Sequence, residues 1–105
     1  MYIVDLSMSF FHPKLAALLV DLEEMFGAFT VTSLWRRDGV HQTIPLRAVD
    51  LRCWNLTVGR EIERWLNERW TYDPTRPGFE VCLYHDTGQG IHLHVQAHDN
   101  TSRRI

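Results

Sequence analysis

Residues 79–97 read FEVCLYHDTGQGIHLHVQA and hold two strand-like runs around a glycine-rich turn. The runs are Phe79–His85 and Ile91–Ala97, in which apolar, aromatic and β-branched residues dominate. Between them stands Gly88-Gln89-Gly90, a sequence typical of a tight turn. A short loop of this kind joins strands that pair directly, so the stretch predicts an antiparallel hairpin near the end of the chain.

The second run of the hairpin separates polar from apolar side chains. Successive residues of a strand point to opposite faces, so His92, His94 and Gln96 should share one face, and Leu93 and Val95 the other. Two imidazoles and an amide on one face form a platform for a metal ion or for proton transfer. The pattern is equally typical of a half-exposed strand with polar residues on its wet side, and the motif alone leaves both interpretations open.

The chain before the hairpin predicts two helices and two more strands. A helix should begin at Pro13 and end near Gly27, because leucines recur at helical spacing between these two helix-boundary residues. A second apolar stripe predicts a helix from about Thr57 to Trp70. The runs Phe29–Trp35 and Ala48–Cys53 read as strands, with a loop at Arg36–Leu46 between them, and we expect these strands to lie side by side.

The length and the order of these elements indicate one small domain. A chain of 105 residues is long enough for a modest core and too short for two domains. An apolar share of 45% is that of a globular protein. We therefore expect a single domain over residues 1–105 of the α+β class, with two helices packed on a small, mostly antiparallel sheet.

Charge and hydropathy argue against several partners. The formal net charge is −2, and the one basic cluster, Arg103-Arg104, reads as a solvated tail, so neither nucleic acid nor an anionic membrane is an expected partner. No run approaches the length of a membrane span, and the start lacks the pattern of a signal peptide, so we expect synthesis in the cytoplasm. Cys53 and Cys82 lie in apolar runs and read as buried free thiols, although a disulfide between them stays open.

A carboxylate and a further histidine precede the hairpin. Asp50 stands inside the apolar run AVDLRC, where a buried carboxylate is rare unless it is paired or bound to a metal. Arg47 and Arg52 offer a salt bridge as the alternative. His41 lies in the loop that leads into this strand. Zinc readily binds two imidazoles and one carboxylate with a fourth position open to water, and it then makes that water a nucleophile near neutral pH.

Several short motifs combine into a resemblance. Ser33-Leu34-Trp35-Arg36, His41, Arg47-Ala48-Val49-Asp50-Leu51 and His92-Leu93-His94 are together similar to motifs of the zinc D,D-peptidases. This metallopeptidase group includes D-Ala-D-Ala peptidases, phage endolysins and the hedgehog signalling domain. The resemblance covers about residues 30 to 97. It implies a hedgehog/D,D-peptidase-like fold and hydrolysis of bacterial cell-wall peptide, by an endolysin or a carboxypeptidase.

The resemblance also implies roles for individual residues. The group holds zinc through a first histidine, an aspartate and a final histidine, which here are His41, Asp50 and His94. His92 would then be the catalytic residue beside the metal. An arginine after a serine-containing strand grips the carboxylate of the substrate in this group. The candidates for substrate binding are Arg36, Ser33 and Gln96.

One departure from the group leaves the activity open. Ile91 stands three residues before His94, where many members have the glutamate that acts as general base. His92, or else Asp86 or Glu80, would have to take that role. The alternatives are a catalytically inactive zinc-binding module of the same fold and, from the His-hydrophobic-His pattern, a nuclease.

Overall fold

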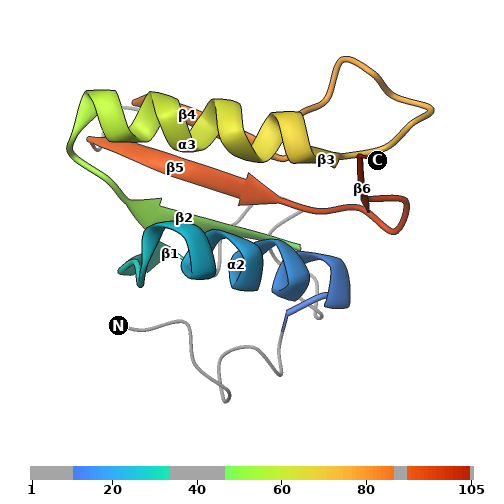
Figure 1. Ribbon diagram of the computed structural model, residues 1–105, viewed down its shortest axis with the longest axis horizontal. Coiled ribbons are helices and arrows are strands. Elements are labelled where there is room, and N and C mark those ends of the chain that lie inside the picture. Colours follow the sequence, from blue (N-terminus) through green and yellow to red (C-terminus); the bar gives the residue numbers. More distant parts are fainter. Residues whose placement is uncertain (1–10, 34–46, 87–89, 105) are drawn as a thin grey trace.

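The computed structural model describes residues 11–33, 47–86 and 90–104, and these form a small α+β domain (Figure 1). Two helices and a small antiparallel sheet make up the domain, as the sequence predicts. The elements in chain order are α2 (Pro13–Phe26), β1 (Val31–Ser33), β2 (Ala48–Arg52), α3 (Leu56–Arg69), β3 (Trp70–Thr71), β4 (Cys82–Asp86), β5 (Ile91–Gln96) and β6 (Ser102–Arg103).

Three antiparallel pairings give a four-stranded sheet in the order β1-β2-β5-β4. The predicted hairpin is β4 and β5, and the predicted neighbour of β1 is β2; both predictions are confirmed. Strand β5 therefore lies in the middle of the sheet, between the strand that carries Asp50 and its hairpin partner. A central strand is held on both edges, which fixes where each of its side chains points.

Both helices cover the same face of the sheet, with α3 lying over β4 and β5 and α2 over β1 and β2 (Figure 1). Leu93 and Val95 are completely buried on this face, as predicted, together with Leu51 of β2. The leucine stripe of α2 packs against them. The buried leucines of α2 are Leu15, Leu18, Leu19 and Leu22.

Side chains of helix α3 also bond to the backbone of β4, which is one of the two edge strands of the sheet. Asn67 donates its side-chain amide to the carbonyl of Cys82 over 2.9 Å and accepts the Cys82 backbone N–H over 3.0 Å. Glu63 accepts the backbone N–H of Tyr84 over 2.8 Å. The backbone groups of an edge strand are a template for pairing with another chain, and here helix side chains occupy them.

A close approach between α3 and β4 requires a glycine. The ring of Tyr84 packs directly on the helix at Gly59, where a Cβ atom would overlap the ring. The Tyr84 hydroxyl then donates to the carbonyl of Cys53 over 2.7 Å. This contact sets the height of α3 above β4, and with it the position of the hairpin.

Two local predictions were wrong. Strand β4 begins at Cys82 rather than Phe79, because the Phe79 ring stacks on Tyr72 at 5.8 Å, outside the sheet. The basic pair near the C-terminus is also more ordered than a solvated tail: Ser102–Arg103 pairs with Trp70–Thr71 as strand β6. Its side chains stay exposed.

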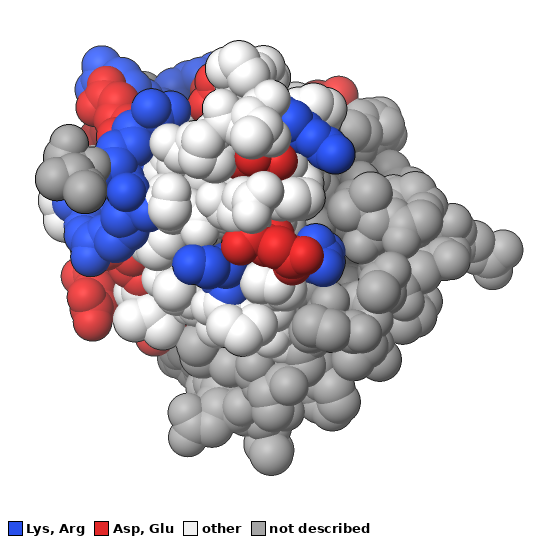
Figure 2. Space-filling view, turned by 90° about the vertical axis from the view of Figure 1, so that its right-hand side faces the viewer, with Lys and Arg blue, Asp and Glu red and all other residues white. Residues whose placement is uncertain are grey.

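Cys53 and Cys82 are buried free thiols, and burial raises the pKa of both. Among the described residues, no helix is long and apolar enough to cross a bilayer. Figure 2 shows one face of the molecule, on which basic and acidic side chains lie side by side around uncharged residues.

Candidate functional site

Asp50 and the two histidines of β5 meet on the sheet face that points away from the helices. In the register of the sheet Asp50 lies directly opposite His94. Asp50 is 4% exposed, His92 8% and His94 6%. The prediction that the histidines share one face is confirmed, and Asp50, His92 and His94 are buried there although the rim of this face is exposed. Polar side chains are rarely buried without partners, so their contacts decide what the cluster does.

The carboxylate of Asp50 lies between the two imidazoles. His94 Nδ1 donates to Asp50 Oδ1 over 2.9 Å, and His92 Nε2 lies 3.6 Å from the same oxygen. His92 Nδ1 donates to the backbone carbonyl of Gly90 over 3.2 Å. Each histidine is therefore oriented through Nδ1, and its Nε2 faces a further oxygen, Asp50 Oδ1 for His92 and Gln96 Oε1 for His94.

Gln96 extends the cluster along β5. Its Oε1 lies 3.2 Å from His94 Nε2, and its Nε2 donates to the carbonyl of Glu80 over 2.7 Å. The second bond orients the amide so that oxygen faces the ring. Gln96 is a predicted substrate-binding residue, and in this structure its amide contacts His94.

A third imidazole, not predicted from the sequence, borders the cluster. His85 of β4 lies opposite His92 in the hairpin register, with ring centroids 5.1 Å apart. Its ring is 6.1 Å from that of His94. A signal was present in the sequence: His85 ends the first strand of a hairpin whose second strand begins Ile91-His92. Only the exact register, however, shows that these two histidines face each other.

The remaining predicted site residues are placed only in part. Ser33 ends β1, where its backbone lies opposite Asp50. His41 and Arg36 lie outside the described residues. The alternative salt bridges of Asp50 are not the contacts that form: Arg47 donates to Asp99 over 3.0 Å, and Arg52 lies over the ring of Trp54.

Imidazole and carboxylate groups are donor types that zinc takes, so the types of these residues match the predicted metal. Within the part of the chain that the structure describes, no group of three or more His, Cys, Asp or Glu side chains is arranged to hold a metal ion. Two of the three predicted ligands, Asp50 and His94, are in contact. That contact joins His94 Nδ1 to Asp50 Oδ1, and zinc stays a prediction from the sequence.

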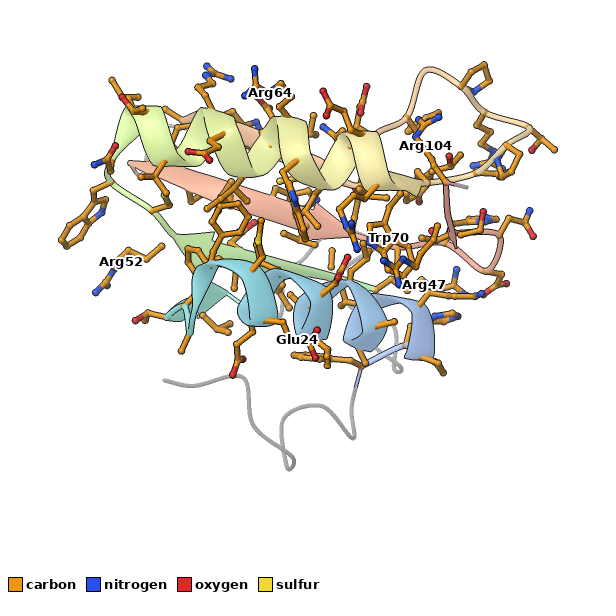
Figure 3. The ribbon with its side chains drawn as sticks, in the orientation of Figure 1. Glu24, Arg47, Arg52, Arg64, Trp70 and Arg104 are labelled. Atoms are coloured by element: carbon orange, nitrogen blue, oxygen red, sulfur yellow. The ribbon has the colours of Figure 1, made fainter. Side chains whose placement is uncertain are left out.

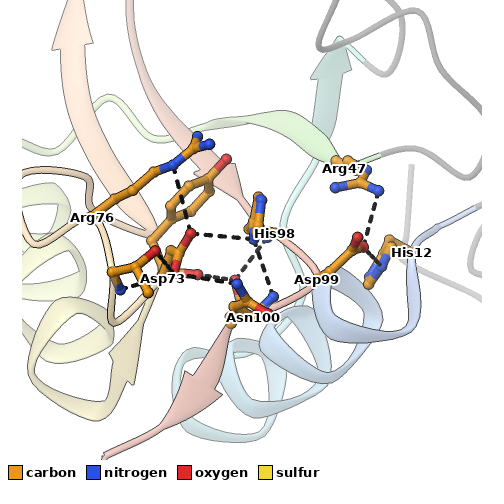
Figure 4. Close-up of polar contacts among 10 residues, drawn as sticks. His12, Arg47, Asp73, Arg76, His98, Asp99 and Asn100 are labelled. Atoms are coloured by element: carbon orange, nitrogen blue, oxygen red, sulfur yellow. Dashed lines mark hydrogen bonds and ion pairs between the residues drawn. The ribbon is translucent and has the colours of Figure 1, made fainter.

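A second buried aspartate shows what a purely structural carboxylate looks like here (Figure 4). Asp73 is 2% exposed and accepts the backbone N–H of Thr75 over 3.0 Å and its hydroxyl over 2.8 Å. The backbone N–H of Thr75 is the main cause that holds the pKa of Asp73 below its usual range. Its other contacts, to Asn100 and His98, tie two turns together.

Asp73 and Asp50 differ in how far along the chain their contacts reach. The shortest hydrogen bonds to Asp73 come from Thr75, two residues away in a local turn, and Asn100 and His98 add longer contacts from a second turn. Asp50 lies in the middle of strand β2. Its contacts are with His92 and His94 of strand β5, and His94 is 44 residues further along the chain. A local turn explains Asp73, whereas no turn explains Asp50. The cluster of Asp50, His92, His94 and His85 is therefore the candidate site.

Comparisons with known proteins add no relative: no family model matches the chain, and neither the curated proteins nor the solved structures contain a match.

Proposed function

We propose that this protein is a zinc-dependent hydrolase of the D,D-peptidase type that acts on bacterial cell-wall peptide. The observation that carries the proposal is the buried Asp50 carboxylate with His94 at 2.9 Å and His92 at 3.6 Å. The substrate class, and a hedgehog/D,D-peptidase-like relationship of the fold, rest on the resemblance of the sequence motifs. Endolysin and D-Ala-D-Ala carboxypeptidase are the two forms of this activity.

In this proposal Asp50, His94 and His41 hold the metal. When bound, zinc acts as a Lewis acid on the scissile carbonyl and makes water nucleophilic near neutral pH. Asp50 contributes the negative charge of the ligand set. The hydrogen bond that His92 Nδ1 donates to the Gly90 carbonyl holds the His92 ring in position, and the amide of Gln96 beside His94 does the same for the His94 ring.

His92 is the proposed proton-transfer residue. Ile91 replaces the glutamate of the D,D-peptidase group, and its side chain packs against the core. His92 lies on the opposite face of β5, next to Asp50, with Nδ1 anchored and Nε2 toward the carboxylate. An imidazole takes up and releases protons near neutral pH, so His92 can supply the step that the missing glutamate would perform. Arg36 and Ser33 are the proposed substrate-binding residues.

One observation favours a second candidate, a zinc-binding module without turnover. Ile91 stands three residues before His94, where many members of the group have the glutamate that acts as general base. Without that base, the same residues would hold zinc as a structural centre. In that case the protein would bind zinc and release no product.

The test is hydrolysis of a pentapeptide ending in D-Ala-D-Ala by the zinc-loaded protein, with released D-alanine or shorter peptide measured by chromatography. Wild type should release product, and Asp50→Asn should release almost none. Asp99→Asn is the matched control, because Asp99 is an exposed carboxylate outside the cluster. Zinc binding without product would establish the inactive module, and equal rates in wild type and Asp50→Asn would overturn the proposed site.

A further inference from the structure

Two histidines lie across from each other in the hairpin of strands β4 and β5. His85 of β4 is directly opposite His92 of β5, so both side chains project from the same face of the sheet. His85 is exposed and His92 is buried, so the pair reaches from the candidate site to the solvent. His92 has a role in the proposed function, whereas His85 has none.

The separation of the two rings matches that of imidazoles which share a metal ion. Their centroids lie 5.1 Å apart, with an angle of 61° between the ring planes. Two imidazoles on one tetrahedral zinc ion have ring centres about 5 Å apart, because each bond from zinc to nitrogen is about 2.0–2.1 Å long and the nitrogen lies about 1 Å from the ring centre. An ion shared by these rings therefore requires rotation of side chains and no change in the strands.

Hydrogen bonds at Gly90 hold this part of the hairpin in place. Its backbone N–H donates to the side chain of Asp86, and its carbonyl accepts the Nδ1–H of His92, each over 3.2 Å. The carbonyl orients the His92 ring through Nδ1, as the outer-shell partner of a metal-binding histidine does. Coordination by His92 therefore falls to Nε2, which lies 3.6 Å from Asp50 Oδ1.

The charges around the pair favour a cation. The carboxylate of Asp50 lies beside His92. Arg52 is opposite His92 in the register of β2 and β5, but it points out of the molecule at the end of the sheet (Figure 3). Its guanidinium carbon lies 4.9 Å from the ring centroid of Trp54, which is 74% exposed. A metal ion on His92 would thus meet a negative charge, while the nearby arginine is directed outward.

We propose that His85 and His92 bind a divalent transition-metal ion, separate from the zinc of the proposed function. Imidazole suits Zn²⁺, Ni²⁺ and Cu²⁺ alike. With two protein ligands and water in the other positions, this site is weaker than a three-ligand site and fills only when free metal is present. Its consequence for activity rests on the proposed function: an ion on His92 Nε2 blocks proton transfer, so excess metal inhibits hydrolysis.

The first arm of the test needs no turnover. Zinc-loaded protein, dialysed free of excess metal, is titrated with Ni²⁺ by isothermal titration calorimetry. His85→Ala should raise the Kd for Ni²⁺ about 100-fold or more, because loss of an outer-shell partner alone costs about 10- to 100-fold. His98→Ala is the control, since it removes an imidazole outside the pair. Equal Ni²⁺ affinity in wild type and His85→Ala would overturn the site.

The second arm follows hydrolysis of the D-Ala-D-Ala pentapeptide while free Zn²⁺ is raised. Each rate is expressed relative to the same protein at low zinc. Wild type should lose most of its rate, and His85→Ala should show no such loss. Equal inhibition of both proteins would overturn the inhibitory role of the pair and leave the activity standing. Ni²⁺ binding that depends on His85, in a protein that releases no product, would retain the metal site and remove the proposed function.

Discussion

Both faces of strand β5 are buried, but one carries apolar side chains and the other carries imidazoles. On the face toward the helices, the side chains of Leu93 and Val95 are fully buried in the apolar core. Toward the other side, His92 and His94 lie beside Asp50. Burial of apolar area stabilises a fold, whereas burial of a carboxylate with imidazoles contributes little net stability and is costly if any partner is lost. The helix-covered face therefore supplies stability, and the polar face is where a function is to be sought.

Substitution of His92 gives the largest expected effect. His92→Ala should lower hydrolysis of the D-Ala-D-Ala peptide about 10²- to 10⁴-fold, the usual contribution of a positioned acid or base. Most of the zinc should remain, because His92 is not a proposed ligand. The measurements are the turnover rate and the metal content of the same preparation. Parallel loss of zinc in His92→Ala and His94→Ala would mean that the two roles are assigned wrongly.

Substitution of Leu93, the neighbour of His92 on the other face, should reduce stability and leave zinc binding intact. Leu93→Ala removes a fully buried side chain from the helix-covered face, and it should lower the free energy of unfolding by about 2–5 kcal/mol. Zinc affinity of the folded fraction should stay close to that of wild type. Urea unfolding and zinc titration at low temperature measure the two quantities. A large change in zinc affinity with little loss of stability would erase the distinction between the faces.

Gly59→Ala tests the packing of the apolar face from the helix side. Alanine favours a helix over glycine by about 1 kcal/mol. Overpacking against the buried Tyr84 ring opposes this gain with about 1–3 kcal/mol. We expect a net loss of up to about 2 kcal/mol in the free energy of unfolding by urea, with little change in zinc binding. A more stable variant would show that α3 and β4 are not in direct contact at this point.

Acid should affect stability through carboxylates outside the site. Burial alone would raise the pKa of Asp21, but hydrogen bonds from Arg69 and from Trp70, at 3.1 Å and 2.9 Å, outweigh it and lower the pKa. A carboxyl group with a lowered folded pKa stabilises the protein above its unfolded pKa, and this contribution disappears as the pH falls through the folded value. Urea midpoints should therefore decrease below about pH 4.

Asp21→Asn provides the control for that prediction. The variant should be less stable than wild type at neutral pH and show a shallower decrease with acid, because one titrating contribution is removed. Identical pH profiles for the two proteins would rule out a role for the Asp21 contacts.

The regular elements could be predicted because their signals are local. Pro13 and Gly27 bound a leucine stripe, and α2 occupies Pro13–Phe26 between them. The alternation in IHLHVQ predicted which residues of β5 face the core, and the glycine-rich turn predicted its partner. Asp50 stood out because a carboxylate interrupts an apolar strand. In each case a few consecutive residues carry the information.

The contacts between elements could not be predicted in the same way. The approach of His85 to His92 depends on the register of the hairpin, which a shift of one residue would reverse. The pairing of Ser102–Arg103 with Trp70–Thr71 joins short segments that have no strand pattern of their own. The stack of Arg52 on Trp54 likewise follows from side-chain placement and not from spacing.

Zinc content tests the central claim most directly. Wild type, dialysed against zinc and then against buffer, should retain about one zinc per chain by mass spectrometric metal analysis. Each of His41→Ala, Asp50→Ala and His94→Ala should retain far less while remaining folded by circular dichroism. His98→Ala, which changes a histidine that contacts Asp73 outside the cluster, should retain the wild-type amount. A wild-type protein that binds no zinc, or full zinc retention by all three ligand variants, would contradict the account.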